Sequence, residues 1–219
     1  MKKIALFLAI AFLMLFLRFF HFNQSPPSPY WEEVALAYDA YSISQTAKDH
    51  HGNFLPRVAF ESFGDFKPSL YFYLAVPFIK VFGLNVFAIR LPTVLSSIAI
   101  IFGIAFLAKN LFQYFYLKNN PKAANFIFYL ALFLASLSPW LLTFSRSAWE
   151  STLATALILW GCNFWLYFMV KNKSKWAILA VIFLVLSTYA YHAARITAPL
   201  LGLALVLAYL KKKTFFALK

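Results

Sequence analysis

The sequence predicts an all-α polytopic membrane protein with about six transmembrane helices and two juxtamembrane helices in its first outer loop. Of its 219 residues, 63% are hydrophobic and only 12% are charged, whereas soluble domains are closer to half apolar and a quarter charged. The apolar residues form stretches close to the length that crosses a bilayer. The basic residues lie between these stretches, which indicates membrane topology and excludes a nucleic-acid-binding stripe.

The first apolar stretch, residues 4–17, follows Lys2 and Lys3 and resembles a secretory signal. The segment that begins at Arg18 has no small-residue cleavage site, so we expect a retained signal-anchor. Cys162 is the only cysteine and lies in an apolar run. One such thiol excludes a disulfide framework and a cysteine-based metal site.

The remaining apolar stretches differ in how well they suit a span. They cover residues 68–83, 91–108, 125–144, 152–170, 176–191 and 196–210. The stretch 68–83 is short and contains Pro77 and Lys80, so we expect it to lie in the membrane interface while the others cross together with the first stretch.

Charge supports this arrangement of six spans in one domain, residues 1–219. The side that holds the N-terminus then carries twelve cations and no acid, and the other side carries eight cations and all seven acids. The twelve are Lys2, Lys3, Lys109, Lys118, Lys122, Lys171, Lys173, Lys175, Lys211, Lys212, Lys213 and Lys219. The positive-inside rule predicts a cytoplasmic N-terminus in a bacterial-type plasma membrane.

The first outer loop, residues 21–90, is too long for a simple connection and too aromatic for disorder. Its proline-rich start leads into an expected helix over residues 30–47. Val34, Ala37, Tyr38 and Tyr41 recur at helical spacing there and predict one apolar face. The interfacial stretch 68–83 is expected to be a second helix, with its proline in the first turn.

Two acids, Glu32 and Glu33, follow Trp31 at the start of the first expected helix. Acids in a first turn are stabilised by the helix macrodipole, which is the structural interpretation. A partly desolvated carboxylate beside a bilayer can instead accept a proton from a nucleophilic hydroxyl or orient it. The residues alone leave both interpretations open.

Cations gather at the outer ends of the expected spans, with Arg90, Arg146 and Arg195 as the clearest cases. Convergent guanidinium groups would suit an anionic headgroup such as a lipid-linked phosphate. The alternative is that they reach lipid headgroups as ordinary snorkelling side chains. For Arg18 and Arg195 the two interpretations have equal weight.

Histidines and one further acid are weaker candidates. His50 and His51, with Glu61 or Asp65, could bind a metal, although polar loop residues are the favoured interpretation. His192 is either a general base or an interfacial histidine, with equal weight.

A set of short motifs follows the order found in one enzyme family. The motifs are Trp31-Glu32-Glu33, Gly52-Asn53-Phe54-Leu55-Pro56, Phe63-Gly64-Asp65-Phe66-Lys67-Pro68, Phe82-Gly83-Leu84-Asn85 and Arg90-Leu91-Pro92. Over about residues 1–200 this order resembles the N-terminal part of the C-type (GT-C) membrane glycosyltransferases. The nearest resemblance is to bacterial relatives of protein O-mannosyltransferases and of aminoarabinose transferase. The family's greater length leads us to expect an N-terminal part of a longer enzyme.

The resemblance implies roles for particular residues. An Asp-Glu pair carries the catalytic acid in that family, which points to Glu32, with Glu in place of Asp, and to Glu33 as its partner. Lys67 matches a lysine that contacts the donor phosphate, and Glu150 matches a second acid. Arg90 matches the arginine at the second span. Asp65 is a further candidate because it lies in the same motif as Lys67. Tyr191 and His192 are further candidates because the segment 191–195 resembles one in close relatives.

The expected function is transfer of a sugar from a polyprenyl-phosphate donor to an acceptor hydroxyl on the outer face. Glu32 would act with Glu33 or Glu150 on the acceptor, and four cations would bind the donor phosphate: Lys67, Arg90, Arg146 and Arg195. The acceptor is a protein, a lipid or a glycan, the membrane lipids are partners, and a divalent metal stays open. The rival is a lipid transporter, flippase or non-enzymatic lipid-binding module, which would place polar groups mid-span.

Overall fold

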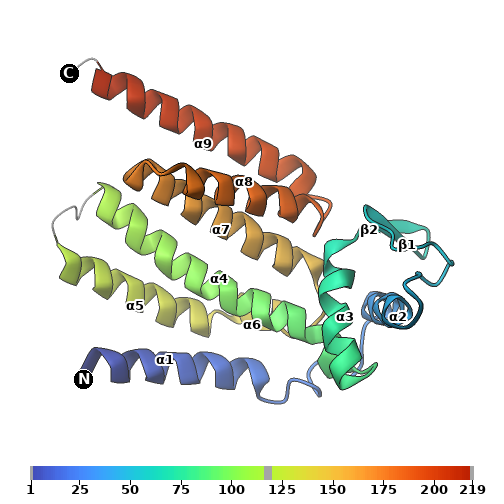
Figure 1. Cartoon of the computed structure of the whole chain (residues 1–219). Helices are drawn as coiled ribbons and strands as arrows, with labels where there is room; N and C mark the ends of the chain where they lie inside the picture. The colour runs from blue at the N-terminus through green and yellow to red at the C-terminus, as the bar shows by residue number, and fades with distance from the viewer. Residues whose placement is uncertain (1, 116–119, 218–219) are drawn as a thin grey trace.

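The structure, a computed structural model, describes residues 2–115 and 120–217, so Lys118 and Lys219 lie outside the described residues. These residues are mostly helical, and Figure 1 shows the helices with one small hairpin. The elements are α1 (Lys2–Phe19), α2 (Trp31–Thr46), β1 (Ala59–Ser62), β2 (Asp65–Pro68), α3 (Leu70–Phe82), α4 (Val86–Phe115), α5 (Pro121–Leu137), α6 (Pro139–Phe144), α7 (Glu150–Lys171), α8 (Ser174–Thr188) and α9 (Ala194–Ala217).

The long helices run lengthwise in one bundle, and α2, α3 and the hairpin lie at one end of it (Figure 1). Helix α4 packs against α5 and α7, α8 packs against α7 and α9, and α1 packs against α5. Successive lengthwise helices run in opposite directions, so both described ends of the chain lie at the end away from α2. All seven acids belong to α2, the hairpin, their connections and the start of α7. The fold therefore separates the acids from the lysines of the α7–α8 connection.

Among the described residues, three helices are long and apolar enough to cross a membrane: α4, α7 and the part of α9 from Ala194 to Lys211. The apolar helices α1, α5 and α8 are shorter, with 18, 17 and 15 residues. A helix rises about 1.5 Å per residue, so these three are shorter than a typical hydrocarbon layer of about 30 Å. Helices that could span a membrane by length and composition are thus present, and a total of six spans stays a prediction.

The expected span over residues 125–144 is not one helix, which corrects the prediction. Helix α5 ends at Leu137, and the short helix α6 begins at Pro139. Proline cannot supply the backbone N–H that would continue α5. The side chain of Ser138 instead accepts a hydrogen bond from the N–H of Leu141 and caps α6.

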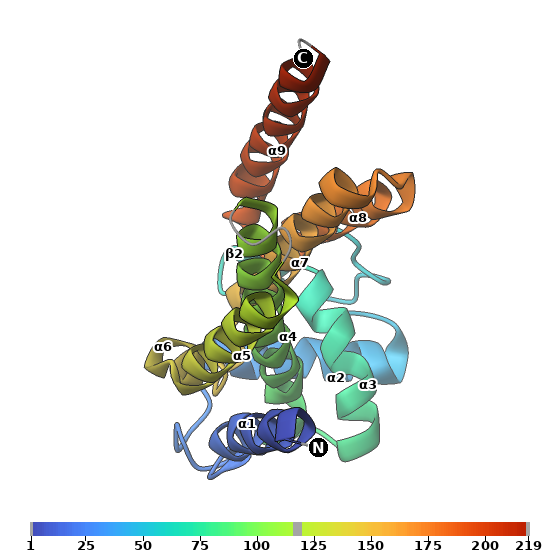
Figure 2. The ribbon, with the colours of Figure 1, turned by 90° about the vertical axis from the view of Figure 1, so that its left-hand side faces the viewer.

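Helices α2 and α3 lie across the end of the bundle; Figure 1 views α2 end-on, whereas Figure 2 shows it from the side. The Glu33 carboxylate accepts from the backbone N–H of Tyr30, which fixes the first turn of α2. The prediction that α3 begins at Pro68 is wrong by two residues, because Pro68 ends β2 and α3 begins at Leu70. The crosswise helix itself matches the expected interfacial element in extent.

The predicted apolar face of α2 is wrong. Val34, Tyr38 and Tyr41 are exposed, and the buried apolar side chains of the helix are Leu36, Ala37, Ala40 and Ile43. The buried set also follows helical spacing, and it packs against α3. With apolar and aromatic residues on both sides of α2, periodicity alone did not identify the face that α3 covers.

The hairpin corrects the expectation of an all-α fold. Strands β1 and β2 pair antiparallel, with Phe60 opposite Lys67 and Ser62 opposite Asp65. The two residues of the turn both have positive φ, 54° at Phe63 and 75° at Gly64, as a tight two-residue hairpin turn requires. The fully buried ring of Phe60 stacks on Phe72 of α3 at 4.1 Å between ring centroids, so the hairpin is fixed to α3.

Cysteine accessibility tests the arrangement of the spans. In a Cys162→Ser background, a cysteine at exposed Phe54 should react with an impermeant maleimide in intact cells. Cysteines in place of Lys122 and Lys173, at the other end of the bundle (Figure 1), should react only after lysis. Labelling of the cysteine at position 173 in intact cells at the rate seen at position 54 would contradict six spans.

Candidate functional site

An ion pair joins the first turn of α2 to β2. Lys67 Nζ lies 2.8 Å from Glu32 Oε1, and the side chains of Lys67 and Glu32 are 7% and 26% exposed. The exposed carboxylate of Asp65 lies 3.9 Å from the same ammonium. Two residues predicted to act together are therefore in contact, although 35 positions separate them.

Glu150 approaches this pair from the bundle. It is the first residue of α7 and is 7% exposed. Its carboxylate interacts electrostatically with Lys67, Glu32 and Asp65. The structure thus brings four of the predicted site residues into one cluster, here called the acid–lysine cluster: Glu32, Asp65, Lys67 and Glu150.

Aromatic rings pack on one another beside the first turn of α2, which carries Glu32. The Trp31 ring contacts Phe63 of the hairpin turn at 4.7 Å between centroids, and Tyr30 lies 5.4 Å from Trp31. Tyr30 also lies 6.2 Å from Trp149, the residue before Glu150. Rings with one polar end suit a boundary between water and lipid.

Glu33 faces a different partner from its neighbour Glu32. Arg90 Nε donates to Glu33 Oε1 at 2.9 Å, and Arg90 Nη2 donates to Oε2 at 3.0 Å. The N–H of Ala148 donates to Oε1 at 2.7 Å, and the N–H of Tyr30 donates to Oε2 at 3.0 Å. Glu33 is 3% exposed and Arg90 is fully buried. Both oxygens of Glu33 are therefore engaged.

Arg90 extends this contact into a hub, defined here as Glu33, Arg90 and their partners. Its Nη1 donates to the carbonyl oxygens of Phe22 and Pro26, and its Nη2 also reaches the carbonyl of Ser28. The hub thereby connects α2, α4, the segment after α1 and the segment before α7. Such a bidentate pair can withstand burial because its polar atoms have partners.

Tyr71 holds α3 against the hub. Its hydroxyl donates to the carbonyl of Ile89 at 2.8 Å and lies 2.6 Å from Thr93 Oγ1. Burial raises the pKa of Tyr71, so the phenol stays protonated and keeps this bond.

Arg146 and Arg195 are not in the cluster. Arg146 Nη2 donates to the carbonyls of Leu17 and Phe20 at the end of α1. Arg195 is exposed at the start of α9, where Tyr191 and His192 are also exposed. The carbonyl of Tyr189 accepts from the N–H of Leu70 at 2.9 Å, which holds this turn beside the start of α3. Within residues 2–115 and 120–217, no ion pair joins either arginine to an acid.

Arg18 is a polar residue whose place sequence reasoning missed, because the snorkelling interpretation is wrong for it. It is fully buried, and it donates to Ser97 Oγ and to the carbonyls of Met14 and Ser136. Its Nη2 has no hydrogen-bond partner within the described chain. Its position near the end of a predicted span indicates that its environment is unusual for a cation. Which helices enclose it depends on tertiary packing, which local patterns do not show.

Two apolar cavities lie near these residues. One, of about 280 Å³, is an open cavity between α3, α4, α7 and α8; its lining includes Leu74, Ala99, Leu153, Trp160 and Phe183. Leu153 is three residues after Glu150, so one face of α7 leads from the acid–lysine cluster to this cavity.

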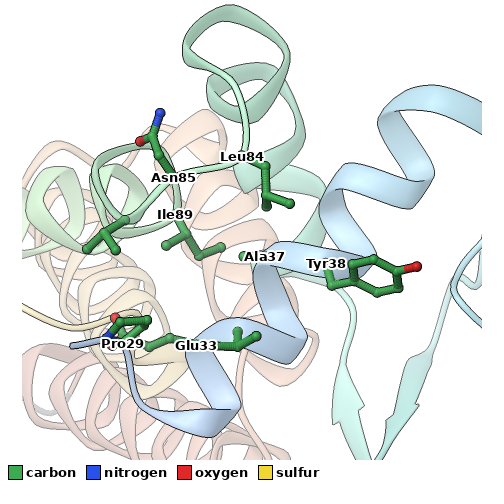
Figure 3. Close-up of a pocket in the computed structure, with 9 residues that line it drawn as sticks. Pro29, Glu33, Ala37, Tyr38, Leu84, Asn85 and Ile89 are labelled. Carbon is green, nitrogen blue, oxygen red and sulfur yellow. The ribbon is translucent and has the colours of Figure 1, made fainter.

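The second cavity, of about 180 Å³, lies between α2 and the start of α4 (Figure 3). Glu33 and Pro29 lie at one side and Leu84 and Ile89 at another, while the Tyr38 ring points away from Glu33.

No group of three or more His, Cys, Asp or Glu side chains that could hold a metal ion occurs in the part of the chain that the structure describes. His50 contacts Asp39 rather than Glu61 or Asp65. The two histidines therefore do not form a metal site with Glu61 or Asp65.

Comparisons of the chain with family models, with curated proteins and with solved structures find no match. The resemblance to the GT-C glycosyltransferases accordingly rests on the motifs alone.

Proposed function

We propose that the protein is a membrane glycosyltransferase that moves a sugar from a polyprenyl-phosphate donor to an acceptor hydroxyl on the outer face of a plasma membrane. The observation that carries the proposal is the acid–lysine cluster at one end of an apolar helical bundle. Paired carboxylates beside one buried ammonium are the groups that such a transfer requires. The six-span topology with a cytoplasmic N-terminus belongs to the same proposal.

In the proposed reaction Glu32 accepts the proton of the acceptor hydroxyl. The acceptor oxygen then forms a bond to the anomeric carbon, and the bond from that carbon to the phosphate oxygen breaks with inversion. The negative charge that develops on the departing lipid phosphate is stabilised by Lys67. Glu32 and Lys67 contact each other in the absence of substrate, so donor binding would exchange this pair for a pair between Lys67 and phosphate, leaving Glu32 available.

The other predicted site residues take secondary parts in the proposal. Glu150, close to the same charges, orients the acceptor or assists Glu32. The contacts of Glu33 and Arg90 favour a positioning role, because every oxygen of the acid is occupied and the arginine is fully buried. Arg146 and Arg195 stay predicted phosphate ligands, with no contact to the cluster to support them.

The cavity beside α7 supports a lipid substrate. Its lining is almost entirely apolar, and it begins one helical turn from Glu150. An isoprenoid chain could occupy it while the phosphate meets Lys67, which explains why a charged site would lie beside membrane-embedded helices.

Filling this cavity tests the lipid part of the proposal. In the Ala99→Phe variant, the new ring should occupy the cavity and raise the KM for a long-chain polyprenyl-phosphate sugar about tenfold. The KM for a donor with a two-isoprene chain should change much less, because less of that chain enters the cavity. Ala177→Phe, on α8 outside the cavity lining, is the matched control. An equal change in KM for both donors relative to the wild type, or no change for the long-chain donor, in Ala99→Phe would contradict the assignment.

The rival function is lipid transport or simple lipid binding. Polar side chains inside the bundle mostly bond to neighbouring backbone: Asn163 Nδ2 donates to the carbonyls of Gly103 and Leu159. This pattern is typical of helix packing rather than of a substrate path, and it favours the enzyme. The test incubates purified protein with radiolabelled polyprenyl-phosphate sugar. Sugar transfer with release of polyprenyl phosphate supports the enzyme, whereas binding or flipping of intact donor supports the rival.

A further inference from the structure

A third cavity, of about 350 Å³, lies between α2, the turn over residues 48–54 and the hairpin. Its lining includes Tyr38, His50, His51, Glu61 and Phe63. None of its lining residues is a lysine or arginine. It thus differs from the acid–lysine cluster in both its residues and its charge.

One side of this cavity is formed by a histidine that a buried acid holds in place. Asp39 Oδ1 lies 2.7 Å from His50 Nδ1 and accepts from the His50 backbone N–H at 2.9 Å. Asp39 is fully buried, whereas the His50 side chain is 29% exposed. When the Asp39 oxygen accepts in this contact, the ring proton lies on Nδ1. Nε2 is then the nitrogen that remains for a ligand.

The hydrogen bonding of the buried Asp39 carboxylate is incomplete. Asp39 Oδ2 is buried and has no hydrogen-bond partner within the described residues. An incompletely paired carboxylate in the interior is unfavourable in general. Groups held at such a cost, beside a cavity, are typical of functional sites.

The turn that carries His50 is itself fixed. Asp49 accepts hydrogen bonds from the backbone N–H groups of His51 and Asn53 and from the Asn53 side chain. Burial on its own raises the pKa of Asp49, but these bonds outweigh it and leave the pKa below its ordinary value. The carboxylate therefore stays ionised and holds the two histidine rings, 3.9 Å apart between centroids, at the cavity.

We propose that this cavity is a subsite for a neutral carbohydrate, the acceptor side of the reaction proposed above. An anionic ligand is disfavoured, because Glu61 supplies negative charge and the lining contains no lysine or arginine. Imidazole and carboxylate groups can hydrogen-bond sugar hydroxyls, and the rings of Tyr38 and Phe63 can cover an apolar sugar face. Asp39 is seven residues from Glu32, about 10 Å along the helix, so the group bound here is remote from the reacting hydroxyl.

Binding is tested without any reaction by saturation-transfer NMR on the purified protein. The probes are methyl α-mannoside, methyl α-glucoside and N-acetylglucosamine. At least one should bind the wild-type protein, and the His50→Ala and Phe63→Ala variants should each weaken it by tenfold or more. His21→Ala and Phe54→Ala, whose side chains lie outside this cavity, are the matched controls and should bind as the wild type does. Thermal melts verify that each variant is folded.

The acceptor role is tested separately by kinetics. With the bound sugar as acceptor, His50→Ala should raise the acceptor KM about tenfold and leave hydrolysis of the donor by water unchanged. Sugar binding without any transfer in the wild type would overturn the proposed enzyme but keep the subsite. Absence of binding by all three probes, or wild-type binding in both His50→Ala and Phe63→Ala, would overturn the subsite.

Discussion

Glu32→Gln should lower the rate of sugar transfer by a factor of about 10²–10⁴, the usual contribution of a positioned general base. The carboxamide has nearly the same shape but cannot accept the proton of the acceptor hydroxyl. It also removes the negative partner of Lys67, so donor binding should persist or strengthen while turnover falls. The measurement is transfer from radiolabelled donor at equal expression, with donor binding determined separately.

Two companion variants make this result specific. Glu32→Asp keeps the carboxylate, one methylene shorter, and should retain more activity than Glu32→Gln. Gln45→Glu changes one charge at an exposed position of the same helix and should transfer at the wild-type rate. A Glu32→Gln protein that turns over like the wild type would remove Glu32 from the mechanism.

The second large effect is expected on stability, at the hub of Glu33 and Arg90. Glu33→Gln or Arg90→Met should each destabilise the protein by about 3–5 kcal/mol, because each leaves a buried charge without its partner. Removal of Arg90 also leaves the carbonyls of Phe22, Pro26 and Ser28 without a donor from its side chain. Thermal unfolding in detergent measures the loss.

The double variant distinguishes a pair from two separate roles. Glu33→Gln combined with Arg90→Met should cost clearly less than the sum of the single changes, because neither charge is then left alone. Arg57→Met, at an exposed loop position, should stay within about 0.5 kcal/mol of the wild type. Additive losses would show that the two side chains act independently.

Much of the helical framework could be predicted from the sequence, because apolar stretches and punctuating charges have strong local signals. The crosswise helix α3 was recognised from its short length and its internal Pro77 and Lys80. The hairpin was missed because its strands have four residues each and its main support is the distant ring of Phe72. The break at Ser138 was missed because the residues on both sides are apolar.

The site was predicted in part for the same physical reason. The contact of Glu32 with Lys67 was expected from their motifs, and the structure brings them together. Arg90 pairs with Glu33 and not with Glu32. Which of the two acids it meets depends on which side of α2 faces the bundle, and the predicted apolar face of α2 was wrong. The bond from Arg146 to the end of α1 joins residues more than 120 positions apart, a separation that local patterns do not encode.

The shortness of α8 has a consequence for the surrounding lipid. Its 15 residues give a length of about 22 Å, and local thinning of the bilayer is one way in which a membrane accommodates so short a span. Phe183 of α8 lines the apolar cavity that begins one turn of α7 from Glu150. Hydrophobic mismatch would then draw the headgroup layer toward the bundle on the side where that cavity lies, which shortens the distance that a lipid phosphate must travel to leave its leaflet.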